Sequence, residues 1–288
     1  MGEKRVEITK VAVIGGGTMG SGIAEVCAKS GLDTIVMEPE AAAAEAAQAR
    51  INGSMDKAVA RGRLSEEDRA NTGALLSYTT DINALSDRDL VIEAIVENEQ
   101  IKLDLFKRLD EVTPEHCILA SNTSSIPLIN LGTATKRPER VLGLHFFNPA
   151  TVQKLCEIVV SIATDDAVVV ACEKFAQNTL GKETIRSKDR AGFIVNRLLV
   201  PYLLQAISLL DTGQVTAEDI DNGMMFGCAH PMGPLTLCDL IGLDTIKSVA
   251  DVLYEEFKEP TYAPPPKLKR MVAAGHLGRK TGKGFYNY

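Results

Sequence analysis

The sequence has no tryptophan, only four histidines, and no two cysteines in a C-x-x-C spacing. Its six cysteines lie mostly in apolar segments, so we expect buried free thiols in a reducing compartment rather than disulfides. No set of His, Cys and acidic residues has metal-ligand spacing, and we expect no metal. No apolar stretch approaches the roughly 18 residues that a membrane-spanning helix needs.

The sequence also has fewer basic than acidic residues: 31 Lys and Arg against 38 Asp and Glu, which gives a net charge of −7. This balance argues against nucleic acid as the main partner, because binding phosphate backbones needs a basic surface. The charged start MGEKRVEITK does not fit a secretory signal peptide. We therefore expect a cytoplasmic protein with no membrane or nucleic-acid partner.

The first forty residues contain a glycine-rich turn between two apolar runs. Residues 8–14 are typical of a buried parallel strand, and a helical pattern follows the turn. Glycines spaced G-x-G-x-x-G at such a junction predict a dinucleotide site, with the pyrophosphate on the helix N-terminus. The residues assigned to this turn are Gly15, Gly17, Thr18, Met19 and Gly20.

A second predicted strand ends at Glu38, at the position where an acid receives hydrogen bonds from the adenosine ribose. A 2′-phosphate would meet like charge there, and none of the next ten residues is Arg or Lys. NAD is therefore favoured over NADP. An Ala-rich helical arm follows, over about residues 39–72, and it could contact a large substrate or be a decorative insertion.

Strand-like and helical segments alternate up to about residue 188, which predicts an α/β sheet. Ligands of such sheets bind beyond the carboxyl ends of the strands. Polar clusters follow three predicted strands, at Glu97–Asn98 with Lys102, at 121–127 (SNTSSIP) and at 145–149 (HFFNP). Packing alone does not explain this clustering.

Beyond residue 188 only helical patterns remain, which predicts a smaller all-helical domain over 189–288 after a first domain over 1–188. Residues 193–210 are apolar nearly all round, as in a helix buried on every side, and Pro201 should kink or divide it. Such a helix in so small a domain needs additional surface to cover it.

Six segments resemble the L-3-hydroxyacyl-CoA dehydrogenases, of the short bacterial 3-hydroxybutyryl-CoA dehydrogenase type. They cover the chain in order: GGGTMGSGIA, ASNTSSI, GLHFFNP, KLCEIV, DRAGFIVNRLL and GRKTGKGFYNY. The resemblance implies a Rossmann-type N-terminal domain, an all-α C-terminal domain, NAD as cofactor, an acyl-CoA substrate and a homodimer formed through the C-terminal domain.

The histidine of HFFNP is the acid/base in that family, and here it is His145. Oxidising a secondary alcohol requires loss of the hydroxyl proton, and imidazole suits that transfer near neutral pH. Glu157 matches the family's partner residue. A carboxylate inside the apolar run LCEIV is costly unless it is paired, so we expect a buried pair of His145 and Glu157.

By the same resemblance, Ser124 and Asn196 hydrogen-bond the substrate's reacting oxygen and acyl group, and Ser124 also borders the cofactor. The resemblance gives NAD contacts to Glu97, Lys102, Asn148 and Lys280. Asn148 could equally be a turn residue before proline, and Lys280 a solvated surface lysine.

The family's Ser and Lys for CoA align with Ser54 and Arg61 on the arm. Arginine keeps the charge but changes the geometry of recognition. The expected reaction is NAD-dependent oxidation of an (S)-3-hydroxyacyl-CoA, with 3-hydroxybutyryl-CoA favoured, and its reverse. Alternatives are 3-hydroxyadipyl-CoA, a free hydroxy acid as in gulonate dehydrogenases of this fold, or a non-catalytic NAD-binding protein. The last should lack part of the His, Glu, Ser and Asn set.

Overall fold

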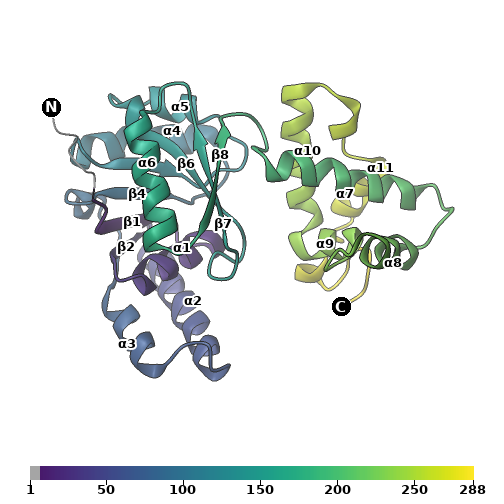
Figure 1. The fold of residues 1–288 in the computed structure, drawn as a ribbon, viewed down its shortest axis with the longest axis horizontal. Helices are drawn as coiled ribbons and strands as arrows, with labels where there is room; N and C mark the ends of the chain where they lie inside the picture. Colours follow the sequence, from purple (N-terminus) through teal and green to yellow (C-terminus); the bar gives the residue numbers. More distant parts are fainter. Residues whose placement is uncertain (1–6) are drawn as a thin grey trace. The chain divides into compact units, whose positions relative to one another are not determined.

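The computed structural model describes residues 7–288. They form two compact units, the first ending at Asp189 and the second running over Arg190–Tyr288 (Figure 1). Within residues 7–288, no helix is long and apolar enough to cross a membrane, and no group of His, Cys, Asp and Glu side chains could hold a metal ion.

The first unit contains one eight-stranded sheet in the order β3-β2-β1-β4-β5-β6-β7-β8. All neighbouring strands are parallel except β6 and β7. The strands are β1 Lys10–Ile14, β2 Asp33–Met37, β3 Leu76–Thr79, β4 Leu90–Glu93, β5 Ile118–Ser121, β6 Val141–Phe146, β7 Leu155–Val160 and β8 Glu183–Lys188. The order 3-2-1-4-5-6 of the parallel part is that of a Rossmann fold, as predicted.

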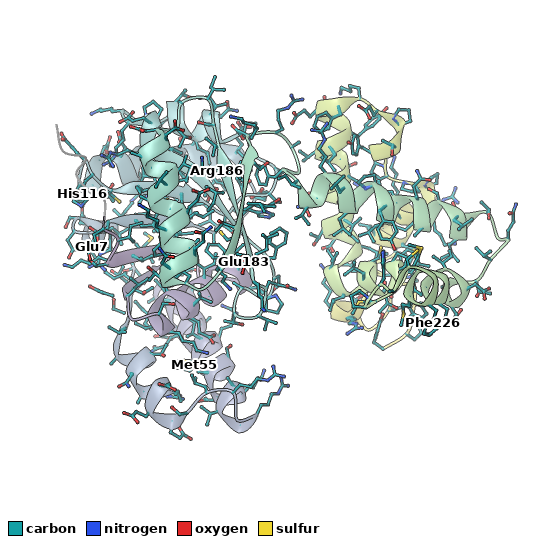
Figure 2. All side chains as sticks on the ribbon, viewed as in Figure 1. Glu7, Met55, His116, Glu183, Arg186 and Phe226 are labelled. Carbon is teal, nitrogen blue, oxygen red and sulfur yellow. The ribbon has the colours of Figure 1, made fainter. Side chains whose placement is uncertain are left out.

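Helices cover this sheet, with α6 crossing one face in Figure 1. They are α1 Thr18–Lys29, α2 Ala41–Ala60, α3 Glu66–Ala74, α4 Glu99–Val112, α5 Leu128–Thr133 and α6 Asp166–Lys174. The sequence analysis did not predict β8. Its residues ETIRSK are mostly half-buried or exposed at the sheet edge, as Glu183 and Arg186 show in Figure 2, so no apolar run marks it.

The arm consists of α2 and α3, and α2 is part of the core of the first unit. Ala47, Ile51 and Met55 are fully buried in the same cluster as the central strands. Figure 2 labels Met55 on this helix. Their 4-residue spacing places them on one face of the helix. Most of the remaining positions of α2 are half-buried or exposed.

The second unit is helical, with α7 Val195–Asp211, α8 Ala217–Cys228, α9 Pro234–Ile241, α10 Leu243–Phe257 and α11 Pro266–Ala273. Helix α7 is not divided but continues through Pro201. It is also not buried on every side in the single chain, since Leu198 is 72% exposed and Leu209 is 46% exposed.

All six cysteines are free, and all but Cys228 are buried. Burial raises the pKa of the Cys27 thiol to about 12, and Cys117 behaves alike. These thiols therefore remain protonated and unreactive near neutral pH. The expectation of buried free thiols is confirmed for five of the six.

Candidate active site

The glycine turn has the close packing that a dinucleotide cradle needs. A Cβ atom on Gly20 would lie 1.7 Å from the Gly15 carbonyl oxygen, so only glycine fits there. Gly16 is equally restricted, because its Cβ would lie 2.2 Å from the Cβ of Ala47 on the arm. No side chain caps the start of α1 and no acid lies in its first turn. Its N–H groups and positive dipole end thus fit a pyrophosphate.

Two side chains of opposite charge hold the peptide groups of Gly16. Its N–H donates to Glu38 Oε1 at 2.5 Å, and its carbonyl accepts a hydrogen bond from Arg50. Arg50 was missed in the sequence analysis because it lies 12 residues after Glu38, outside the ten considered. The argument that no cation is close to Glu38 was therefore incomplete, since the fold of α2 returns one to the glycine turn.

The antiparallel pairing of β6 and β7 places His145 directly opposite Glu157. Side chains of opposite residues on neighbouring strands lie on the same face of a sheet. The Nδ1 atom of His145 lies 2.6 Å from Glu157 Oε2. Glu157 is fully buried and His145 is 6% exposed, so this hydrogen bond is protected from water. The expected buried pair of His145 and Glu157 is therefore present in the structure.

Glu97 is the centre of a second polar group, at the ends of β4 and β5. Its Oε1 accepts hydrogen bonds from Thr123 Oγ1 (2.5 Å), from Ser125 Oγ (2.9 Å) and from the Ser124 backbone N–H (3.2 Å). Its Oε2 lies 2.9 Å from Lys102 Nζ. Glu97 therefore fastens the loop that carries Ser124.

Lys102 lies deeper than its expected contact with NAD implies. It is only 1% exposed, and its Nζ contacts both Glu93 (2.8 Å) and Glu97. Glu93 was missed in the sequence analysis, although it ends the otherwise apolar strand LVIE, which is the same signal that Glu157 gives in its own strand. Direct contact of Lys102 with the cofactor stays a prediction.

Burial raises the pKa of Glu97, but the charge of Lys102 and the hydrogen bonds from Thr123 and Ser125 outweigh burial and bring it below its ordinary value. A lowered folded-state pKa means that ionised Glu97 stabilises the fold above pH 4.5, and that this contribution is lost as the pH falls below that value. We expect Glu97→Gln to cost about 1 kcal/mol at pH 7, roughly 2–4 °C in Tm, after solvent screening.

Thermal unfolding from pH 7 to pH 3 tests this expectation. The difference in Tm between wild type and Glu97→Gln should shrink toward pH 3. Glu111→Gln, an exposed change at the other end of α4, should leave Tm close to wild type throughout. An equal difference at pH 7 and pH 3 would contradict the assigned pKa direction.

Asn148 and the cis peptide bond to Pro149 lie in the loop between β6 and β7. Asn148 lines a small cavity of about 150 Å³ that also contacts Thr18 at the start of α1 and Ser54 on α2. The loop is anchored by Lys182, a buried amine that donates to the carbonyls of Ala150 (2.6 Å) and Gln153 (2.7 Å). Its backbone therefore lies between the cradle and the arm.

A larger cavity of about 650 Å³ lies on the exposed side of the arm. Ser54 and Arg61, the two residues expected to bind CoA, both line it. The sequence analysis missed four further cationic residues of its lining, Lys29, Arg50, Lys57 and Arg63. Burial raises the pKa of Glu25 in the same cavity. Because five cationic side chains and only one carboxylate line the cavity, it is suited to phosphate groups.

Two predicted site residues belong to the second unit. Asn196 is half-buried in the first turn of α7. Lys280 lies in the C-terminal segment, where its Nζ lies 2.6 Å from both carboxylate oxygens of Asp244. A lysine with an ion-pair partner of its own is held in place, but its contact with NAD stays a prediction.

Comparison with known proteins accounts for both units. Residues 10–190 match the family model "3-hydroxyacyl-CoA dehydrogenase, NAD binding domain", and residues 192–288 match the C-terminal domain of the same family. The chain belongs to the 3-hydroxyacyl-CoA dehydrogenase family. It is an oxidoreductase of that family with an NAD-binding domain, as the resemblance of its motifs implied.

Individual relatives agree over nearly their full lengths. A 3-hydroxybutyryl-CoA dehydrogenase of Mycobacterium tuberculosis is 53% identical, with 98% of this chain and 99% of the relative covered. The crystal structure of FadB2 from that organism has a TM-score of 0.97 at the same identity and coverage. The structure of (S)-3-hydroxybutyryl-CoA dehydrogenase from Ralstonia eutropha has a TM-score of 0.93 at 42% identity, covering 98% of this chain and 99% of that one.

Proposed function

We propose that the protein interconverts (S)-3-hydroxyacyl-CoA and 3-oxoacyl-CoA with NAD. The observation that carries the proposal is the buried hydrogen bond between His145 and Glu157 at the ligand-binding edge of a Rossmann sheet. Relatives named 3-hydroxybutyryl-CoA dehydrogenase support a four-carbon acyl group as the substrate.

His145 performs the proton transfer in this proposal. His145 directs Nδ1 at the carboxylate of Glu157, and its other ring nitrogen, Nε2, would take the proton of the substrate's hydroxyl group. Glu157 fixes the tautomer and stabilises the imidazolium that forms. In the reverse direction His145 returns the proton to the oxygen of the ketone.

NAD, when bound, accepts the hydride from the carbon that bears the hydroxyl group. The residues that would hold its pyrophosphate are those of the glycine turn and the first turn of α1, and Glu38 would hold the adenosine ribose. Ser124 and Asn196 would orient the substrate oxygen and the acyl group, which lowers the entropic part of the barrier.

The cationic cavity on the arm favours a CoA ester over a free hydroxy acid. CoA carries several phosphate charges, and five cationic residues line this cavity. A free acid carries one carboxylate and would have no use for five cations on the arm. We propose that Ser54 and Arg61 contact CoA there, together with Lys57.

Consumption of NADH with acetoacetyl-CoA is the direct test, run beside NADPH and beside free acetoacetate. Turnover with NADH and the CoA ester alone would support the cofactor, the substrate class and the use of the arm. Turnover of the free acid would move the function to another hydroxy-acid substrate. The same assay with 3-oxoadipyl-CoA tests the alternative substrate, 3-hydroxyadipyl-CoA, whose acyl group is longer and acidic.

Arg61→Glu should raise the KM for acetoacetyl-CoA about 3–10-fold with little change in kcat, because an exposed charge contributes modestly to phosphate binding. Arg108→Glu makes the same change of charge on an exposed face of α4, away from the cavity, and serves as the matched control. A KM that is equal in the two variants would remove Arg61 from the CoA site.

We also propose a homodimer formed through the second unit. Its surface exposes large apolar side chains, with Leu198 on α7 at 72% and Phe226 on α8 at 81%. Phe226 is labelled in Figure 2. Burial of these side chains against a partner subunit would remove their apolar surface from water. We expect Phe226→Asp to yield monomers in light scattering after size exclusion, whereas Ile162→Asp, at a 96% exposed position of the first unit, stays dimeric. An unchanged mass for Phe226→Asp would place the interface elsewhere.

We place the protein in the cytoplasm. Five of its cysteines are buried as free thiols, which suits a reducing compartment.

A further inference from the structure

A second buried carboxylate, Glu93, lies beneath the loop that carries Ser124. It is the last residue of β4 and is fully buried. Taking a carboxylate out of water is costly unless an ion pair and several hydrogen bonds compensate for it. Glu93 has these partners, since it contacts Lys102 and accepts the Ile95 backbone N–H at 2.7 Å. The reaction proposed above assigns Glu93 no task.

One branch of hydrogen bonds runs from Glu93 through β5 into the loop. Ser121 Oγ donates to Glu93 Oε2 at 2.6 Å. The same Ser121 oxygen accepts the backbone N–H of Thr123 at 3.1 Å. Since Glu93 and Ser121 are direct neighbours in the β4–β5 register, the branch is short and lies entirely in the buried part of the sheet edge.

The other branch runs through α4. The Nζ atom of Lys102 lies between Glu93 and Glu97, at 2.8 Å and 2.9 Å. Glu97 in turn accepts the backbone N–H of Ser124 at 3.2 Å. Lys102 thereby links a carboxylate inside the sheet to the one that contacts the loop. Both branches end on consecutive residues of the same loop.

We propose that Glu93 is a positioning residue for Ser124 in the dehydrogenase reaction, an inference that rests on the proposed function. The two branches fix the backbone on each side of Thr123, and Ser124 follows directly. Glu93 touches neither substrate nor cofactor and acts through the loop. Polar networks whose members are all hydrogen-bonded hold one geometry, which substrate alignment needs.

A double-mutant cycle on kcat with acetoacetyl-CoA and NADH tests this inference. Glu93→Gln keeps the size of the side chain but removes its charge, and we expect kcat to fall about 10–100-fold through misplacement of Ser124. In the background of Ser124→Ala the same change should lower kcat little further, because the group it positions is already gone. Ser121→Ala removes only one branch, so it should lower kcat less and should also be non-additive with Ser124→Ala. It replaces Glu93→Gln in the cycle if that variant does not fold.

Asp110→Asn is the matched control, because Asp110 forms a buried ion pair with Arg137 (2.9 Å) toward the other end of α4. It should lower Tm without lowering kcat. Additive losses for Glu93→Gln and Ser124→Ala, or full turnover in Glu93→Gln, would overturn the positioning role while leaving the proposed function intact. Absence of turnover in the wild-type protein would instead refute the proposed function itself.

Discussion

His145→Asn is expected to lower kcat for acetoacetyl-CoA reduction about 10²–10⁴-fold, the range that a positioned acid–base group contributes. Asparagine retains a polar group of similar size near Nδ1 but cannot carry the transferred proton. The glycine turn does not involve His145, so the affinity for NADH should persist. Stopped-flow or steady-state kinetics together with a fluorescence titration of NADH separate the two quantities.

His116→Asn is the control for this expectation. His116 also lies near a carboxylate, with Nε2 3.3 Å from Asp89 Oδ1, but its side chain is 57% exposed (Figure 2). The same substitution there should leave kcat unchanged. Equal turnover in His145→Asn and wild type would remove the acid–base assignment, and loss of NADH binding would point to a folding defect.

The second large effect is expected from Glu157→Gln, with a loss in kcat of about 10²–10⁴-fold. Glutamine can still hydrogen-bond to the ring, but it supplies no negative charge to stabilise the imidazolium. It can also present its amide N–H₂ to Nδ1, which favours the wrong tautomer. Because Glu157 is fully buried, no solvent can replace its charge.

Glu183→Gln, an exposed change on the edge strand β8, controls for the substitution itself and should leave kcat as in wild type (Figure 2). A circular dichroism melt of both variants checks that the sheet is intact. Turnover near wild type in a folded Glu157→Gln protein would reduce Glu157 to a packing role.

The pairing of His145 with Glu157 was predicted because the family resemblance named both residues, and local sequence signals supported it. Each is a polar residue within an apolar strand, and a buried charge demands a partner. Glu93 gives a similar local signal at the end of LVIE, but the sequence analysis did not single it out, because it ends the apolar run instead of lying inside it. The rule that a buried carboxylate needs a partner would have identified Glu93, had it been applied to the end of the strand.

Arg50 and the burial of Lys102 could not be predicted in the same way. Both depend on how α2 and α4 return against the sheet, and no local pattern encodes the distance between such segments. Strand β8 escaped for another reason, since half-exposed edge strands carry no apolar run. The fold class was predicted from the glycine turn and from the alternation of strands and helices. Missing one edge strand or one contact between segments does not change that prediction.

The antiparallel register of β6 and β7 has a consequence for how this enzyme can diversify. His145 and Glu157 are paired by the register of the two strands, and residues 147–154 form the loop that joins them. The same loop contributes Thr151 and Val152 to the cavity on the arm. If the proposed function holds, changes at the loop positions that line the cavity are expected to alter substrate choice while the pairing of His145 and Glu157 is kept. A single-residue deletion inside either strand would turn one partner to the opposite face of the sheet and separate the pair.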